Sequence, residues 1–107
     1  MSIISWENAE TRHRKEGFIK IYVDEKIGGR KLRMHLSVLG PYKRPHKPHR
    51  HDGEEIFFIL EGEGKVKIED EEFKVGPMTA IFIPSNLLHG IENAGEKVLK
   101  YLVIVAK

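Results

Sequence analysis

The chain of 107 residues contains no cysteine. Disulfides, thiolate metal ligands and a cysteine nucleophile are therefore excluded, and any metal that the protein binds must use nitrogen and oxygen donors. A strong excess of one charge is also missing, because 18 Lys and Arg residues face 16 Asp and Glu residues. The overall electric field therefore gives no reason to expect a nucleic-acid partner.

Long apolar runs are missing as well. The longest, YLVIVA at 101–106, is too short to cross a bilayer, and the first residues lack the basic and then apolar pattern of a secretion signal. We therefore expect a cytoplasmic protein with no membrane partner. Charged residues make up 32% of the chain and glutamine is absent. This composition is typical of heat-adapted proteins, so a thermophilic source is a hypothesis.

The sequence shows no long helical periodicity. Short apolar runs alternate with turns rich in glycine, proline and acidic residues, which predicts an all-β sandwich or barrel. The length favours one domain over residues 1–107. The predicted strands are Phe18–Val23, Lys31–Leu39, Glu54–Leu60, Lys65–Ile68, Glu72–Val75, Ala80–Pro84, His89–Glu92 and Val98–Ala106. The polar segment Ser5–Gly17 fits a short helix or an irregular arm, and residues 1–17 are assigned to an N-terminal arm.

Two of these strands, Glu54–Leu60 and Val98–Ala106, have apolar residues at both odd and even positions, so both of their faces should be covered. A small barrel buries only its inner face. The other face then needs a second sheet or a second subunit, and a homodimer is the simplest arrangement.

The predicted strand Lys31–Leu39 separates its polar and apolar residues by face. The apolar face should be the core, which leaves Arg33 and His35 at the solvent or in the polar wall of a pocket. The apolar positions are Leu32, Met34, Leu36 and Val38.

A metal site is the main functional signal in the sequence. His49, His51 and Glu55 lie at even offsets, so an extended chain would place them on one face, and His89 could join them from a distant strand. Imidazole nitrogen and carboxylate oxygen suit Fe, Mn, Zn, Ni, Co or Cu as a divalent ion, without selecting among them. A His-x-His pair in a basic, proline-rich loop is usually solvated surface when it stands alone.

These residues belong to two motifs that resemble those of the cupins, small barrels with a double-stranded β-helix, or jelly-roll, fold. The first motif lies within residues 40–62 and the second within residues 78–93. The first is matched in full from its first histidine, by His49, His51, Glu55 and Gly62. The second is matched at Pro84, His89 and Asn93, whereas Met78 and Asn86 stand where the family has glycine. Asparagine tolerates the left-handed backbone that a turn glycine supplies.

The resemblance to small single-domain microbial cupins implies that His49, His51, Glu55 and His89 hold one divalent metal inside the barrel. Four protein ligands leave one or two coordination positions open. We therefore expect a mononuclear-metal enzyme acting on a small oxygen-rich substrate, as a dioxygenase or as a sugar or keto-acid isomerase or epimerase.

The sequence leaves other functions open. The same barrel could bind or sense a sugar or organic acid without turnover, whereas a metal store is disfavoured because such sites saturate their ligands. No catalytic residue is identified from the sequence. The candidates for a general base, provided that they face the cavity, are Tyr22, Tyr42, Tyr101 and Glu54.

A basic cluster precedes the predicted site and could attract a carboxylate or phosphate of a small-molecule ligand. A solvated surface explains the cluster equally well, and nucleic acid is disfavoured because no aromatic residues are interleaved for stacking. The cluster consists of Lys43, Arg44, Lys47 and Arg50. Beside it, His46 could add a ligand or guard the mouth of the site, although an exposed position is favoured.

Overall fold

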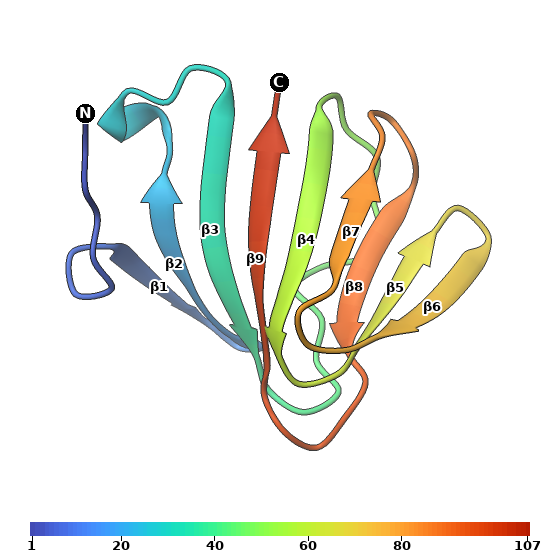
Figure 1. The fold of residues 1–107 in the computed structure, drawn as a ribbon. Coiled ribbons are helices and arrows are strands. Elements are labelled where there is room, and N and C mark those ends of the chain that lie inside the picture. Colours follow the sequence, from blue (N-terminus) through green and yellow to red (C-terminus); the bar gives the residue numbers. More distant parts are fainter.

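The computed structural model describes all of residues 1–107 and is built almost entirely of β-strands (Figure 1). The elements are β1 (Glu10–Arg14), β2 (Gly17–Val23), the 3₁₀ helix η1 (Glu25–Ile27), β3 (Leu32–Leu39), β4 (Glu54–Glu61), β5 (Gly64–Ile68), β6 (Glu71–Val75), β7 (Ala80–Ile83), β8 (His89–Asn93) and β9 (Leu99–Ala106). They form a six-stranded sheet in the order β1-β2-β3-β9-β4-β7 and a three-stranded sheet in the order β6-β5-β8. This is the all-β jelly-roll architecture that the sequence predicts.

Each of the eight predicted strands is present, and at each strand one end differs by a single residue. The structure adds β1, which pairs antiparallel with β2. The prediction of a helix or irregular arm there is wrong. All five side chains of β1 are exposed, so this edge strand has no apolar alternation that could identify it. No helix in the structure combines the length and the apolar character needed to cross a membrane.

The last strand, β9, lies at the centre of the six-stranded sheet between β3 and β4. Both pairings are antiparallel. Its inward residues Leu99, Tyr101 and Val103 are buried, whereas its outward residues are only partly covered. One of the two strands predicted to be covered on both faces thus lies at the centre of the sheet, with its outer face open.

The core lies between the two sheets. On β4 and β9 the odd-numbered residues point into it, because Phe57 stands opposite Val103 and Ile59 opposite Tyr101. The three-stranded sheet contributes residues from the other side. The buried core cluster consists of Leu39, Phe57, Ile59, Val66, Ile83, Ile91, Leu99, Tyr101 and Val103. Glu55, Phe57 and Ile59 are the buried residues of β4 and share this inward parity.

The face of β3 that points into the barrel differs from the prediction. His35 stands opposite Val103 and Ser37 opposite Tyr101, so this polar parity faces the interior. The apolar parity lies on the outer face, where Leu36 and Val38 are buried but Leu32 is 54% exposed. The prediction was wrong about the core because it treated polar residues as outward-facing. His35 instead occupies the other position considered, the wall of a pocket.

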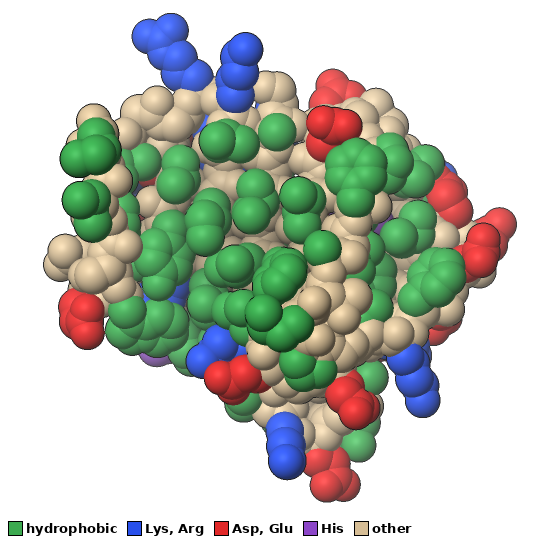
Figure 2. Space-filling model, in the orientation of Figure 1, with side chains coloured by type: hydrophobic (Ala, Val, Ile, Leu, Met, Phe, Trp, Pro, Cys, Tyr) green, Lys and Arg blue, Asp and Glu red, His purple; other side chains and the backbone are tan.

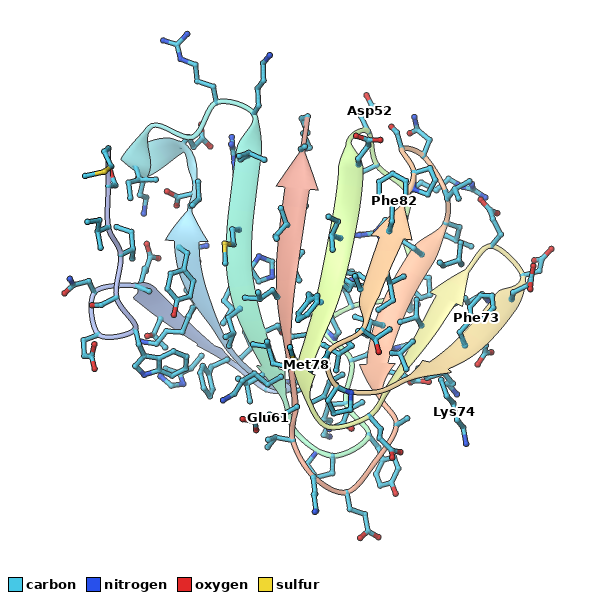
Figure 3. The ribbon with its side chains drawn as sticks, viewed as in Figure 1. Asp52, Glu61, Phe73, Lys74, Met78 and Phe82 are labelled. Carbon is cyan, nitrogen blue, oxygen red and sulfur yellow. The ribbon has the colours of Figure 1, made fainter.

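The outer face of the six-stranded sheet is broadly apolar. Figure 2 shows hydrophobic side chains gathered over the strands that face the viewer in Figure 1. Part of this face is covered by the N-terminal segment, since Trp6 packs edge-on against Phe18 and lies 4.7 Å from Lys20 Nζ. Farther along, Phe82 remains 56% exposed, and its position on β7 is labelled in Figure 3.

The turns at the motif positions use left-handed backbone. Gly62 has φ 86°, and a Cβ there would lie 2.3 Å from the carbonyl oxygen of Val98, so only glycine fits. Met78 and Asn86 have φ 62° and 69°. Both substituted positions therefore keep the conformation for which the motif uses glycine. Met78 meets this demand at the surface, where it is 72% exposed (Figure 3).

Asn93, the last residue of the second motif, has a structural role. Its side chain is buried, and its Nδ2 donates to the carbonyl oxygens of Leu39 at 3.2 Å, Gly40 at 2.9 Å and Lys97 at 2.8 Å. Its Oδ1 accepts from the Gly95 N–H at 2.9 Å. One amide thus joins the loop after β3 to the turn between β8 and β9.

Candidate metal centre

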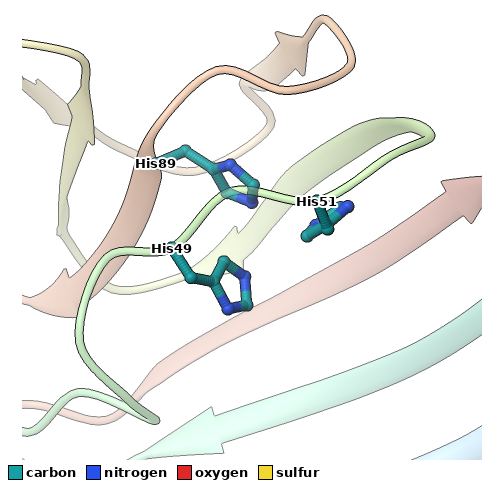
Figure 4. Close-up of side chains that lie close together, drawn as sticks. All are labelled: His49, His51 and His89. Carbon is teal, nitrogen blue, oxygen red and sulfur yellow. The ribbon is translucent and has the colours of Figure 1, made fainter.

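Three imidazoles converge beside the start of β4 (Figure 4). A pair of backbone hydrogen bonds brings the first and last together, from His49 N to His89 O at 2.9 Å and from His89 N to His49 O at 3.0 Å. His51 follows two residues later, outside any strand. Ligand nitrogens of the three side chains all lie within 4.8 Å of one another. The backbone bridge, rather than one extended strand, aligns the pair with His89.

Glu55 lies against two of these imidazoles. It points inward from β4 and is 5% exposed. A single oxygen, Oε1, lies 2.8 Å from Nε2 of His51 and 2.8 Å from Nε2 of His89. The four residues identified from the sequence are therefore neighbours, with the three imidazoles forming the compact group and Glu55 beside it.

The hydrogen bonds on the far side of the rings determine which nitrogen carries the proton. Nδ1 of His51 lies 2.9 Å from the carbonyl oxygen of Asp52, and Nδ1 of His89 lies 2.8 Å from that of Leu87. A carbonyl oxygen only accepts, so both Nδ1 atoms donate. In a neutral ring Nε2 then has a lone pair, and both lone pairs face Glu55 Oε1.

Without a positive charge among them, the two Nε2 lone pairs and Glu55 Oε1 would be three hydrogen-bond acceptors facing one another. A divalent cation would supply this charge and accept electron pairs from both Nε2 atoms and from the carboxylate. Metal-bound histidines commonly donate their second N–H to a backbone carbonyl, as both rings do here. The donor set therefore fits a divalent transition metal.

His49 is held in the form that binds metals. Burial lowers the pKa of His49, and the neighbouring imidazoles of His46, His89 and His51 lower it further. A neutral imidazole is the form that coordinates a metal. His46 stacks on His49 with ring centroids 4.2 Å apart, and its Nδ1 lies 2.8 Å from the carbonyl oxygen of Lys47. His46 is exposed, as expected, and lies outside the three-imidazole group.

A cavity of about 330 Å³ lies beside the imidazoles, a size in the range of small-molecule sites. His49 and Glu55 form part of its wall, so the cavity reaches the candidate metal centre. Most of the remaining wall is apolar and includes Phe57, Val103 and Ile91. A compact organic molecule would therefore meet polar groups at the metal end and apolar groups along its body.

Of the four candidates for a general base, only Tyr101 lines the cavity. Burial raises the pKa of Tyr101 to about 12, although a hydrogen bond with Ser37 opposes the shift. The phenol is therefore protonated at neutral pH. It can donate or accept a hydrogen bond but cannot serve as the base.

Besides His46, four further polar residues line the cavity: His35, Ser37, Arg14 and Glu16. Burial lowers the pKa of His35, with a smaller lowering from the Arg14 charge, so its imidazole is neutral at physiological pH. Sequence reasoning had placed His35 at the solvent or in a pocket wall. It could not place Arg14 or Glu16, because β1 was not predicted.

The basic side chains of Lys43, Arg44, Lys47 and Arg50 do not line this cavity. Arg50 pairs with Glu69 at 3.0 Å and donates to the carbonyl oxygen of Asn86 at 3.2 Å. Arg44 lines a separate groove against the three-stranded sheet, and Lys43 and Lys47 are exposed. None of these four basic side chains lines the cavity, so a role in attracting an anionic ligand stays a prediction.

Comparisons with known proteins agree with this architecture. A family model described as the cupin domain matches residues 35–105. MJ1618, an uncharacterized protein of Methanocaldococcus jannaschii, is 44% identical over 55 residues, which cover 50% of this chain and 44% of MJ1618. Auxin-binding protein 1 of Arabidopsis thaliana is 32% identical over 68 residues, 55% of this chain and 34% of that protein. The matches thus span less than half the length of either relative.

Among solved structures, the polyketide cyclase RemF of Streptomyces resistomycificus has the same fold, with a TM-score of 0.83. The superposition covers 99% of this chain and 79% of RemF, at 24% sequence identity.

Proposed function

Because this chain belongs to the cupin domain family, we propose that it holds one divalent transition metal through His49, His51, His89 and Glu55 and acts on a small oxygen-rich molecule. The observation that carries the proposal is the arrangement around Glu55 Oε1. Two Nε2 lone pairs face this oxygen at 2.8 Å, while both rings donate Nδ1–H to backbone carbonyls.

When bound, such a metal supplies Lewis acidity and an open position for an oxygen donor. The wall residues of the cavity define what that donor can belong to. Phe57 and Val103 exclude water from one side, whereas Ser37 and the protonated phenol of Tyr101 offer hydrogen bonds. These walls would orient a small molecule rather than a polymer.

We propose an enzyme of the dioxygenase type or of the sugar or keto-acid isomerase-epimerase type. His35 is the residue best suited to accept a proton from a bound substrate, because its ring lines the cavity and is neutral. Tyr101 cannot accept this proton, because its own phenol stays protonated at neutral pH.

The second candidate is a module that binds a small organic ligand without turnover. The similarity to auxin-binding protein 1, a protein named for binding rather than catalysis, favours it. Oxygen uptake with catechols, flavonols, thiols and acireductones, beside epimerisation of sugar phosphates, distinguishes the two candidates. An enzyme is expected to turn over one of these, and saturable binding without product would support the module.

A second copy of this chain is the proposed occupant of the apolar outer face. Side chains of β9 and β4 stand opposite one another there, with Ile104 facing Ile56 and Leu102 facing Phe58. Sedimentation equilibrium should then give about twice the 12.3 kDa of one chain. A 12.3 kDa species at all concentrations would exclude the homodimer.

The metal site is tested by elemental analysis of tag-free protein and of two matched variants. His51→Ala should lose nearly all bound metal, because a ligand is removed from a partly exposed position where the fold depends on it little. His46→Ala is the control, since this neighbouring imidazole lies outside the three-imidazole group. Equal metal contents in folded wild-type protein and His51→Ala would contradict the proposal. The metal identified also narrows the chemistry, because iron or copper favours oxygen chemistry and zinc favours isomerisation or binding.

A further inference from the structure

The edge strand β1 places one arginine on the inner side of the barrel. Arg14 stands opposite Gly17, and Gly17 stands opposite Leu39, which is 1% exposed in the core. Residues opposite one another across a sheet project from the same face, so Arg14 projects from the face that carries Leu39. Its side chain lines the same cavity as His49 and Glu55.

Arg14 differs from the nearby arginines because its charge is not used within the fold. Arg12 binds Glu10 at 2.7 Å, and Arg33 donates to the carbonyl oxygen of Gly29 at 2.6 Å. None of the ion pairs in the structure includes Arg14, and its side chain makes no hydrogen bond to the protein. A free guanidinium in the wall of a largely apolar cavity is a binding group for an anion.

We propose that Arg14 binds the carboxylate of a small monoanionic ligand whose other end carries an oxygen donor for the metal. The inference rests on the proposed function, because the oxygen donor of the ligand is inferred from the metal proposed at that end of the cavity. Most of the rest of the wall is apolar and includes Phe57, Val103 and Ile91. The ligand class is therefore a compact carboxylic acid with an apolar body.

The charge of the ligand follows from the other ionisable groups in the wall. Glu16 and Glu55 both line the cavity, and neither is paired with Arg14. Because Glu55 would face the bound metal, a second negative charge away from the metal would meet Glu16, which favours one carboxylate on the ligand over two. His35 beside Arg14 is neutral and adds no further positive charge.

The test compares two probes of the same shape on the Zn²⁺-loaded protein, 3,4-dihydroxybenzoate and its neutral analogue 3,4-dihydroxybenzamide. Both present adjacent hydroxyls to the metal, but only the acid presents a carboxylate to Arg14. Calorimetry should show the acid binding about tenfold more tightly, a moderate preference because Arg14 is exposed and keeps part of its hydration.

Three variants test whether Arg14 causes the preference for the acid over the amide. Arg14→Gln should abolish the preference while leaving binding of the amide unchanged, and Glu16→Gln should strengthen binding of the acid by removing a repulsive charge. Arg50→Gln is the control, because this arginine pairs with Glu69 away from the cavity, and it should keep the full preference. A preference that is missing in the wild type, or that survives in Arg14→Gln, overturns the inference.

A second measurement does not need the metal. Benzoate added to metal-free protein should shift the NMR signal of the Arg14 Nε–H, whereas benzamide should not. If neither dihydroxy probe binds the Zn²⁺-loaded protein, the metal has no open coordination position and the proposed function is wrong. The benzoate titration then decides the inference by itself, and an unshifted Arg14 signal overturns it.

Discussion

The two faces of the six-stranded sheet are both apolar, yet they serve different purposes. Along β4 the inward residues Glu55, Phe57 and Ile59 are buried, whereas the outward residues Ile56 and Phe58 are only partly covered. The inward side also includes the carboxylate of the candidate metal centre. The outer face has an apolar surface and no ionisable group of the site. Hydrophobicity thus identifies both faces as covered, but only the polar residues among them identify the functional one.

The inner face combines the core with the wall of a binding site. At one end of this face side chains pack into the core, as at Ile59, which is fully buried. At the other end a cavity of about 330 Å³ replaces packing and is bordered by His35 and Tyr101. The polar groups of this face are tolerated because they lie at the cavity, where a ligand or water can reach them.

The largest expected difference between the two faces comes from isoleucines on the same strand. Ile59→Ala should lower the free energy of unfolding by about 3–4 kcal/mol, because it removes a fully buried side chain and leaves a cavity in the core. Ile56→Ala makes the same chemical change on the outer face and should cost roughly half as much. Urea denaturation of the two variants measures both costs.

Protein concentration sharpens this comparison. If a second copy covers the outer face, the cost of Ile56→Ala should grow with concentration, whereas the cost of Ile59→Ala should not. Equal costs for the two substitutions at low concentration would mean that the faces are equally buried in one chain. The distinction between a core face and a docking face would then be wrong.

The sequence predicted the strands well because their apolar alternation is itself the cause of their pairing. It missed β1, whose residues Glu10–Arg14 are all exposed and are fixed by pairing with β2 rather than by burial. It also assigned the core to the wrong face of β3, because the parity of Arg33 and His35 was expected at the solvent or in a pocket wall. No periodicity can show that a barrel interior includes a cavity in which polar residues are useful.

The candidate site was predicted from motif spacing, and the structure brings its four residues together. What spacing could not give is how they meet. The bridge between His49 and His89 and the two Nδ1–H donors depend on backbone positions far apart in the chain. The position of Arg14 at the cavity could not be predicted either, because it depends on β1, which the sequence analysis missed.

An alkaline titration gives a smaller effect that is specific to the inner face. The pKa of Tyr101 is raised to about 12 by burial, so between pH 10 and 12 the unfolded chain loses this proton while the folded chain keeps it. The contribution of Tyr101 to stability is therefore constant below pH 10 and falls above it, by an amount on the order of 2–3 kcal/mol at pH 12. Tyr101→Phe should reduce this decline. A decline of the same size in the variant would show that other groups cause it.

The smallest expected effect is in acid and concerns His35. Burial lowers the pKa of His35 in the folded state, so below the usual histidine value of about 6.5 the unfolded chain binds a proton that the folded chain does not. The free energy of unfolding of metal-free protein should therefore fall as the pH drops from 7 toward 5. The pKa of His49 is lowered in the same direction, so both histidines contribute to the slope. Urea unfolding of EDTA-treated His35→Gln should show a shallower slope than the wild type, because one of the two contributions is removed. If the slopes are identical, His35 exchanges its proton freely with water, and the inner face is then more hydrated around β3 than the burial of Ser37 and Leu39 implies.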